Sequence, residues 1–289
     1  MKPDRDPYGA IDIVAACNDR EILELNLLQS PEIASGLIKP HLEWHATSAG
    51  AAYNRALDAT RGEIVVFAHQ DVYLPAGWTR LLMRRVEELN RTNPDWALLS
   101  TFGVALNGWH QGIAWASSLG AIVGRLPVSP VRVQSFDEML IVMRRSAGVR
   151  FDEGLPGFHM YGTDIVQIAR AAGRGSYVVA LPIIHNDRFH AALGPDFAEA
   201  YHYVRRKWRR CLPVWTPILE VTRFGLPLRQ AIRHTARSCA DRRLFAVEPQ
   251  THPEVYAALC GWSDLSAVAT GSIRLRRPSS GSRALDAVS

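Results

Sequence analysis

A run of five apolar residues, Ile64–Ala68, is followed at once by His69-Gln70-Asp71, and this segment constrains the fold more than any other. The run does not alternate with polar residues, so both faces of the strand are expected to be covered, as in a parallel sheet flanked by helices. In open sheets of this kind, ligands bind beyond the carboxyl ends of the strands. Asp71 is therefore predicted to lie in a working cleft.

Strands and helices are expected to alternate along most of the chain. A strand at 11–16 ends at polar residues, and a helix capped by Thr47 or Ser48 runs to the stop at Arg61-Gly62. Further helices are predicted at 77–91, 163–172 and 195–210, and further strands at 96–105, 131–134, 139–143 and 177–184. This order predicts an α/β fold with a mostly parallel central sheet flanked by helices.

The length of 289 residues suits one large domain with an appendage. Residues 1–213 are predicted to form the α/β domain, and the weaker pattern at 214–270 indicates a helical C-terminal extension. Residues 271–289 are small and polar, so a disordered tail is expected there.

The charged N-terminus lacks the apolar core of a secretion signal, and no apolar run is long enough to span a membrane. The four cysteines are scattered, without zinc or disulfide spacing. A cytoplasmic location is therefore expected. The net charge of +5 suits an anionic partner. The basic helix end at 205–210 could contact phosphates, nucleic acid or the inner face of a membrane, or it could simply be a solvated face.

Polar residues follow three predicted strands, at Cys17-Asn18-Asp19, His69-Gln70-Asp71 and His185-Asn186-Asp187. A buried carboxylate needs a cation or hydrogen-bond donors, so Asp71 is a candidate metal ligand, and His185 at a strand end is a second. A carboxylate, an imidazole and phosphate oxygens suit Mn²⁺ better than Mg²⁺. The structural alternatives are that Asp71 caps the following turn and that His185 is an ordinary core imidazole.

Asp164 lies in the first turn of its predicted helix, where the helix dipole favours a negative charge. The functional alternative is a general base that takes a proton from an acceptor hydroxyl. Two acidic pairs, which include Glu138, Asp152 and Glu153, could orient substrate hydroxyls. The glycine-rich loop with His159 could bend over an acceptor or simply connect two elements. No P-loop, dinucleotide fingerprint or hydrolase elbow is present.

The order of these segments resembles the GT-A type, family-two-like glycosyltransferases, and in particular a group that contains the sequence HQDVYLP. The resemblance covers roughly residues 11–213. It rests on Asn54-Arg55-Ala56 before Gly62-Glu63, on residues 67–75, and on Tyr161-Gly162-Thr163-Asp164 with His185 after the next strand.

The resemblance implies a GT-A fold that binds a nucleotide-diphospho-sugar donor. It implies that Cys17, Asn18 and Asn54 lie along the nucleotide site. It also implies that His69-Gln70-Asp71, which stands where the family has its Asp-x-Asp metal motif, contacts the nucleotide-sugar. Many relatives carry Glu-Asp-x-Asp at the helix start, and Asp164 matches only the last acid. Either Asp164 is the base, or Asp152, Glu153 or Glu138 supplies it, or transfer activity has been lost.

Metal-assisted transfer of a sugar to an acceptor hydroxyl is thus the expected function. The acceptor is a glycan, a lipid-linked sugar, a protein or a small molecule. The main alternative is a non-catalytic nucleotide-sugar or glycan-binding protein on the same fold. Binding of nucleic acid is not expected, because no recognition motif is present.

Overall fold

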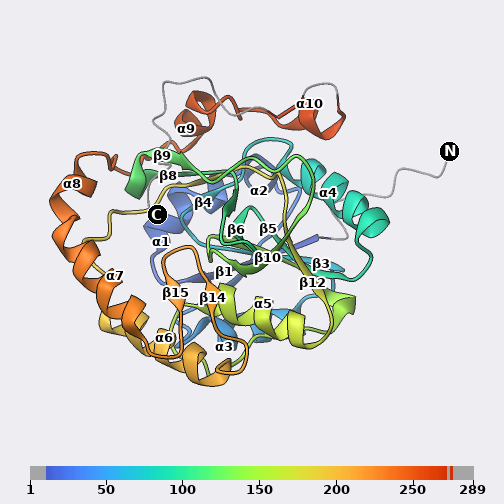
Figure 1. Ribbon diagram of the computed structural model, residues 1–289. Helices are drawn as coiled ribbons and strands as arrows, with labels where there is room; N and C mark the ends of the chain where they lie inside the picture. The colour runs from blue at the N-terminus through green and yellow to red at the C-terminus, as the bar shows by residue number, and fades with distance from the viewer. Residues whose placement is uncertain (1–10, 272–273, 276–289) are drawn as a thin grey trace.

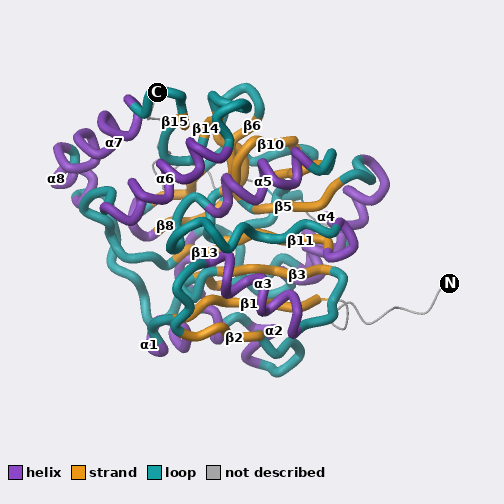
Figure 2. The backbone as a smooth tube through the Cα atoms, turned by 90° about the horizontal axis from the view of Figure 1, so that it is seen from below, coloured by secondary structure: helices purple, strands orange, loops and turns teal. Residues whose placement is uncertain are grey.

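A nine-stranded sheet organises the computed structural model, which describes residues 11–271 and 274–275. The strand order is β2-β1-β3-β11-β5-β12-β10-β6-β7 (Figure 2). The strands are β1 (Ile11–Cys17), β2 (His41–Trp44), β3 (Ile64–Ala68), β5 (Trp96–Ser100), β6 (Phe102–Ala105), β7 (His110–Gly112), β10 (Val131–Phe136), β11 (Leu140–Arg144) and β12 (Gly175–Val178).

Six of these strands point in the same direction, which confirms the predicted α/β class with a mostly parallel sheet. The neighbours are nevertheless mixed. Strand β3 runs parallel to β1 on one side, as predicted, but antiparallel to β11 on the other. An uninterrupted apolar run reports burial on both faces and does not distinguish the direction of the neighbouring strand.

Helices cover both faces of the sheet, because alternate residues of β3 enter two different cores. Ile64, Val66 and Ala68 pack on the side of α1 (Arg20–Leu25), α2 (Pro31–Ala34) and α4 (Trp78–Thr92). Val65 and Phe67 pack on the side of α3 (Ala49–Ala59), α5 (Tyr161–Ala171) and α6 (Pro195–Lys207) (Figure 1). Ser48 caps α3 through its side chain, as expected.

A smaller sheet, in the order β4-β13-β8-β9, lies beside the large one. Its strands are β4 (Val72–Tyr73), β8 (Ala114–Ala116), β9 (Ala121–Val123) and β13 (Ile183–His185). The single strand predicted at 177–184 is therefore wrong. The chain leaves the large sheet after Val178, passes Pro182, which has no amide proton to donate, and enters the smaller sheet as β13. The strand predicted at 96–105 likewise divides into β5 and β6.

The C-terminal segment packs against the sheet. A hairpin of β14 (Val214–Trp215) and β15 (Glu220–Val221) precedes α7 (Leu226–Arg237) and α8 (Cys239–Arg243), and α9 (Glu254–Leu259) and α10 (Ser266–Ala269) follow. Tyr256, Trp262 and Leu265 are buried in the same core as Ile64. Helices α9 and α10 therefore help to close one face of the molecule (Figure 1).

The expected tail, 271–289, lies almost entirely outside the described residues. Three short 3-10 turns, Leu27–Gln29, Ser117–Leu119 and Arg145–Ala147, complete the described elements. Among the residues that the structure describes, no helix combines the length and the apolar character needed to cross a bilayer.

Candidate functional site

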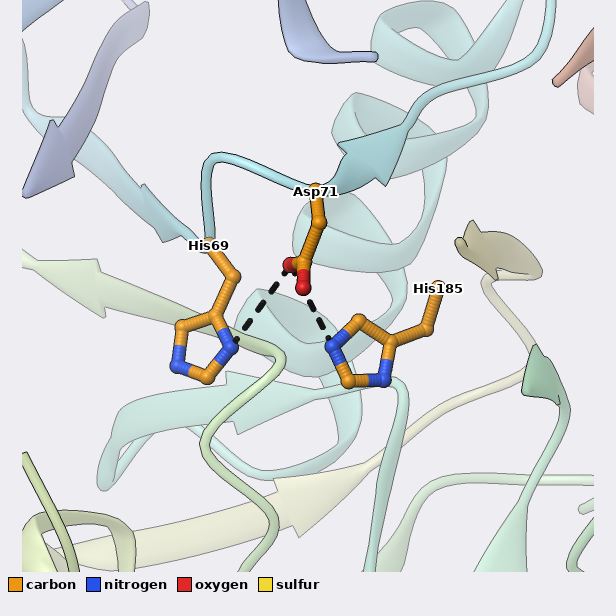
Figure 3. Close-up of side chains that lie close together, drawn as sticks. All are labelled: His69, Asp71 and His185. Carbon is orange, nitrogen blue, oxygen red and sulfur yellow. Dashed lines mark ion pairs between the residues drawn. The ribbon is translucent and has the colours of Figure 1, made fainter. Parts of the chain in front are cut away.

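His69, Asp71 and His185 converge at one end of the two sheets (Figure 3). His185 Nε2 lies 3.3 Å from Asp71 Oδ1, and His69 Nδ1 lies 3.9 Å from the same oxygen. One potential ligand atom from each residue lies within 4.8 Å of the other two. The three side chains could therefore hold a single metal ion.

Strand pairing brings these residues together. His69 follows β3, and its backbone N-H donates to Met139 O at the start of β11. Asp71 immediately precedes β4, which pairs antiparallel with β13, so that Val72 faces His185. The backbone N-H of Asn186 donates to Asp71 O at 2.9 Å, which fixes the two segments against each other.

Two buried atoms at this point lack a hydrogen-bond partner within the described residues, namely Asp71 Oδ1 and His185 Nε2. They approach each other but do not meet in hydrogen-bonding geometry. Buried polar atoms are seldom left unpaired in native proteins. A divalent cation between them would satisfy both, and two imidazole nitrogens with one carboxylate oxygen form a donor set that first-row transition metals accept. The residues present thus fit a divalent cation.

A hydrogen-bond chain sets the orientation of His69. The Tyr161 hydroxyl donates to Glu138 O at 2.9 Å, so its oxygen is free to accept from His69 Nε2-H at 2.8 Å. This arrangement leaves the lone pair of Nδ1 directed toward Asp71. The packed surroundings lower the pKa of His69, against the opposing effect of Asp71, and so favour the neutral ring that a metal ligand requires.

Asp187 stands behind His185, with its Oδ1 at 3.8 Å from Nδ1 of that ring. Burial alone would lower the pKa of His185, but the carboxylates of Asp187 and Asp71 outweigh it and raise this pKa to about 10. Burial alone would raise the pKa of Asp71, but the nearby imidazoles of His185 and His69 hold it well below its usual range. The carboxylate is therefore ionised, as a ligand must be, whereas His185 carries a proton without metal that a bound cation would displace from Nε2.

A cavity of about 390 Å³ opens beside Asp71. Two cationic side chains line it, Arg188 after β13 and Arg243 at the end of α8, together with the amides of Asn26 and Gln250. Arg243 is 5.5 Å from the centre of the Phe189 ring, within reach of a cation-π contact. The lining also contains the acids Asp71, Glu21 and Glu248, so the two guanidinium groups stand beside carboxylates next to the candidate metal group.

The residues expected along a nucleotide site do not share one environment: Asn18 and Gln70 bond to each other, whereas Cys17 and Asn54 are buried. Gln70 Oε1 accepts from the backbone N-H groups of Asn18 and Asp19, and its amide donates to Asn18 Oδ1 at 2.6 Å. Cys17 is buried, and burial raises the pKa of its thiol to about 12. Asn54 is also buried. Its Nδ2 donates to Phe151 O, and its Oδ1 accepts from the backbone N-H of Phe151.

Asp164, the expected base, is 1% exposed. Its Oδ2 accepts from Lys207 Nζ at 2.7 Å and its Oδ1 from Trp208 Nε1 at 2.6 Å. Both donors come from the end of α6, so this carboxylate fastens α6 to α5. Burial raises the pKa of Asp164, although Lys207 and Trp208 act against it.

The other acidic candidates are spread over the region between α3, α5 and α6. Asp152 accepts from Lys207 Nζ and from the Tyr203 hydroxyl, and Glu153 accepts from Asn54. His159 pairs with Asp196 at 3.1 Å, at the start of α6.

Glu138 differs from these acids, because its carboxylate lies against the start of α5, where Oε1 accepts from Gly162 N-H at 3.1 Å. Burial and the nearby Asp137 raise the pKa of Glu138 to about 8. Its backbone carbonyl also receives the Tyr161 hydroxyl that orients His69.

Three features of the site go beyond the sequence-based prediction. His69 joins Asp71 and His185 as a possible third ligand, whereas the sequence indicated a nucleotide contact. Tyr161 is part of a segment that carries the family resemblance, but its hydrogen bond to His69 depends on how α5 packs. Arg243 carries no local sequence signal, because only the tertiary fold brings α8 to the cavity.

Comparison with known proteins gives distant likenesses. No family model matches the chain. A curated protein of Fuscovulum blasticum, described as "ATP synthase subunits region ORF 6", is 28% identical over 191 residues, which cover 64% of this chain and 75% of that one.

Solved structures resemble the chain in fold alone. GalNAc-T7 with UDP, GalNAc and Mn²⁺ has a TM-score of 0.46 at 11% identity, over 80% of this chain and 56% of that one. S. aureus TarS 1–349 with UDP-GlcNAc has a TM-score of 0.42 at 12% identity, over 82% of this chain and 73% of that one. The mannosyltransferase PcManGT from Pyrobaculum calidifontis, with GDP-Man and Mn²⁺, has a TM-score of 0.40 at 15% identity, over 91% of this chain and 79% of that one. At these values the function has to be inferred from the site itself.

Proposed function

We propose that this chain is a metal-assisted glycosyltransferase of the GT-A type, which moves a sugar from a nucleotide-diphosphate donor to an acceptor hydroxyl. The observation that carries the proposal is the approach of Asp71 Oδ1 to His185 Nε2 at 3.3 Å, where neither atom has a hydrogen-bond partner among the described residues. These atoms lie beside a cavity whose lining includes Arg188 and Arg243. A site for one cation next to two guanidinium groups suits a diphosphate, which carries several negative charges over a few ångströms.

His69, Asp71 and His185 would hold the divalent cation, with Mn²⁺ preferred over Mg²⁺ because two of the three ligand atoms are imidazole nitrogens. When bound, the cation supplies positive charge that stabilises the departing diphosphate. Arg188 and Arg243, which line the same cavity, would bind the diphosphate as well. Asn18 and Gln70, which bond to each other at the end of β1, would meet the nucleoside.

In the transfer, the bond between the sugar's anomeric carbon and the diphosphate oxygen breaks, and a bond to the acceptor oxygen forms. The acceptor loses its proton to a base. Asp164 could serve only after Lys207 and Trp208 withdraw from its two oxygens. Glu138 needs no such movement, and a carboxyl with a pKa of about 8 is tuned for proton transfer near neutral pH. We therefore favour Glu138 as the base, with Asp152, Glu153 and His159 as candidate acceptor contacts.

Thermal-shift measurements on a panel of nucleotide-sugars, with Mn²⁺, with Mg²⁺ and without metal, test the donor site. One nucleotide-sugar is expected to raise the melting temperature in the presence of Mn²⁺, because a ligand that binds only the folded state stabilises it. Slow release of the nucleoside diphosphate should accompany binding. If no nucleotide-sugar changes the melting temperature under any metal condition, the proposal fails.

The alternative function is binding of a nucleotide-sugar or glycan without transfer. It is favoured by the occupied oxygens of Asp164, which leave the chain without the base expected from the resemblance. Such a protein would show the thermal shift but release no nucleoside diphosphate, even with candidate acceptors present. Measuring both quantities on the same preparation distinguishes the two functions.

A further inference from the structure

Positive charge is concentrated in one stretch of the chain. Residues 205–240 contain eight arginines and Lys207 but a single acidic residue, Glu220, so their net charge is +8. The complete chain has a net charge of +5, so the remainder is acidic overall, at −3. The stretch runs from the last turn of α6 through the β14–β15 hairpin and along α7. One side of the molecule is therefore strongly cationic.

Five of these arginines line a common cavity of about 510 Å³. They are Arg205, Arg206, Arg209, Arg210 and Arg223. Within the described residues, none of the five forms an ion pair with a carboxylate, and Arg205 donates instead to the backbone carbonyl of Arg223 at 3.0 Å. Like charges gathered without counter-charges repel one another. Their grouping is most easily stabilised by a partner that carries many negative charges.

Apolar side chains project into solvent directly beside this cavity. Phe224 follows Arg223 and is 91% exposed, and Leu226 at the start of α7 is 57% exposed. Gly225 lies between them in the left-handed region, at φ 67°, and packs against the guanidinium of Arg205. The turn therefore holds both apolar side chains outward, next to the arginines.

Helix α7 extends the cationic surface. Arg229, Arg233 and Arg237 recur every four residues and are exposed, so they form one stripe along the helix. Figure 1 shows α6 and α7 running along the same side of the molecule. We call this surface the arginine face; it consists of Arg205, Arg206, Arg209, Arg210, Arg223, Phe224, Leu226, Arg229, Arg233 and Arg237.

We propose that the arginine face docks the protein on a membrane surface rich in anionic lipids, with Phe224 and Leu226 inserted among the headgroups. Each basic residue near such a surface adds attraction to the lipid phosphates, and this attraction is screened by salt. Exposed aromatic and aliphatic side chains beside the charges add apolar burial that a purely ionic partner would not supply. The docking does not depend on the metal group or on sugar transfer.

Co-sedimentation of the full chain with lipid vesicles tests this proposal. The protein is expected to bind vesicles of phosphatidylcholine mixed with phosphatidylglycerol at least roughly tenfold more tightly than vesicles of phosphatidylcholine alone. High salt should remove most of this difference. Equal binding to both vesicles, or binding to neither, overturns the proposal.

Two variants separate the contributions. The double substitution Arg209→Glu with Arg210→Glu should weaken binding to anionic vesicles by roughly tenfold or more. Phe224→Ser should weaken binding while leaving its salt dependence unchanged, because it removes apolar insertion alone. The matched control is Arg80→Glu with Arg91→Glu, which reverses two exposed charges on α4, and it should bind as the unmodified protein does. An equal loss in the control overturns the assignment to this face.

Single-stranded oligonucleotides provide the competing polyanion. If the chain binds an oligonucleotide tightly, fails to bind anionic vesicles, and loses the oligonucleotide on reversal of Arg209 and Arg210, the partner is a nucleic acid and the proposal is wrong. Melting curves of each variant establish that it is folded. The salt dependence of the unmodified protein decides the question independently of any variant.

Discussion

Asp71 and Asp164 are both carboxylates in packed surroundings, and they differ in what meets their oxygens. Asp164 is bonded on both oxygens, by Lys207 and Trp208. Asp71 leaves Oδ1 unpaired among the described residues and faces two imidazoles. A buried carboxylate whose donors are already in place serves the fold, whereas one that still needs positive charge can bind a ligand. Burial alone therefore does not distinguish a structural acid from a candidate ligand.

The largest expected effect concerns Asp71. Asp71→Asn should weaken Mn²⁺ binding by about 100-fold or more, since loss of even an outer-shell partner costs 10–100-fold. The free energy of unfolding without metal should also fall, because the change removes the carboxylate that pairs with the two imidazoles. Isothermal titration with Mn²⁺ and urea unfolding measure the two quantities. Asp58→Asn, on an exposed acid paired with Arg150, is the control and should bind Mn²⁺ normally.

Asp164→Asn should lower stability without affecting the metal group. Loss of the charge that meets Lys207 and Trp208 should lower the free energy of unfolding by about 2 kcal/mol, because a buried pair is broken while Lys207 keeps its contact with Asp152. Mn²⁺ affinity should be unchanged. If Asp164→Asn instead left stability intact and abolished transfer, Asp164 would be the base and the contrast with Asp71 would disappear.

Tyr161→Phe tests the orientation of His69. The hydroxyl that accepts from His69 Nε2 is lost, while the buried ring is kept. Mn²⁺ affinity should fall by roughly 10-fold, at the lower end of outer-shell effects. Tyr203→Phe removes a hydroxyl bonded to Asp152 instead and should leave Mn²⁺ affinity unchanged. An unchanged affinity in Tyr161→Phe would mean that His69 is not a ligand.

The last test concerns Glu138 and uses the pH dependence of stability. Its pKa is raised to about 8 in the folded chain from an ordinary value of 4.5, so the folded state keeps a proton that the unfolded state loses. Stability should therefore fall as pH rises from about 4.5 to 8, by up to about 1.4 kcal/mol per pH unit for one proton. Glu138→Gln should lose this slope while retaining the acceptor for Gly162. Urea unfolding at several pH values would detect an unchanged slope, which would contradict the assignment.

The polar residues that follow apolar runs could be read from the sequence, because such runs are local patterns. Asp71 and His185 were both expected as ligands from such runs, and the structure brings them together. The partners of Asp164 could not be predicted, since Lys207 and Trp208 are more than forty residues away and reach it only through helix packing. Arg243 was missed for the same reason.

The incorrect strand predictions also arose because strand arrangement depends on distant parts of the chain. The segment 177–184 is apolar throughout, so its pattern does not reveal that the chain passes from the large sheet to the smaller one at Pro182. Likewise, the antiparallel partner of β3 depends on how β11 returns along the sheet. Hydrophobic patterns report which faces are covered, and the choice of neighbour is a property of the whole chain.

The pairing of β4 with β13 has a consequence for how the site comes into being. His69 and Asp71 are neighbours in the chain, but His185 lies about a hundred residues further on, and closing so long a loop is slow compared with local folding. A chain that ends before β13 would hold only two of the three side chains. Tight metal affinity would therefore appear only when folding is complete. The bound ion would then link the segment around β3 and β4 to β13, which joins it later in folding.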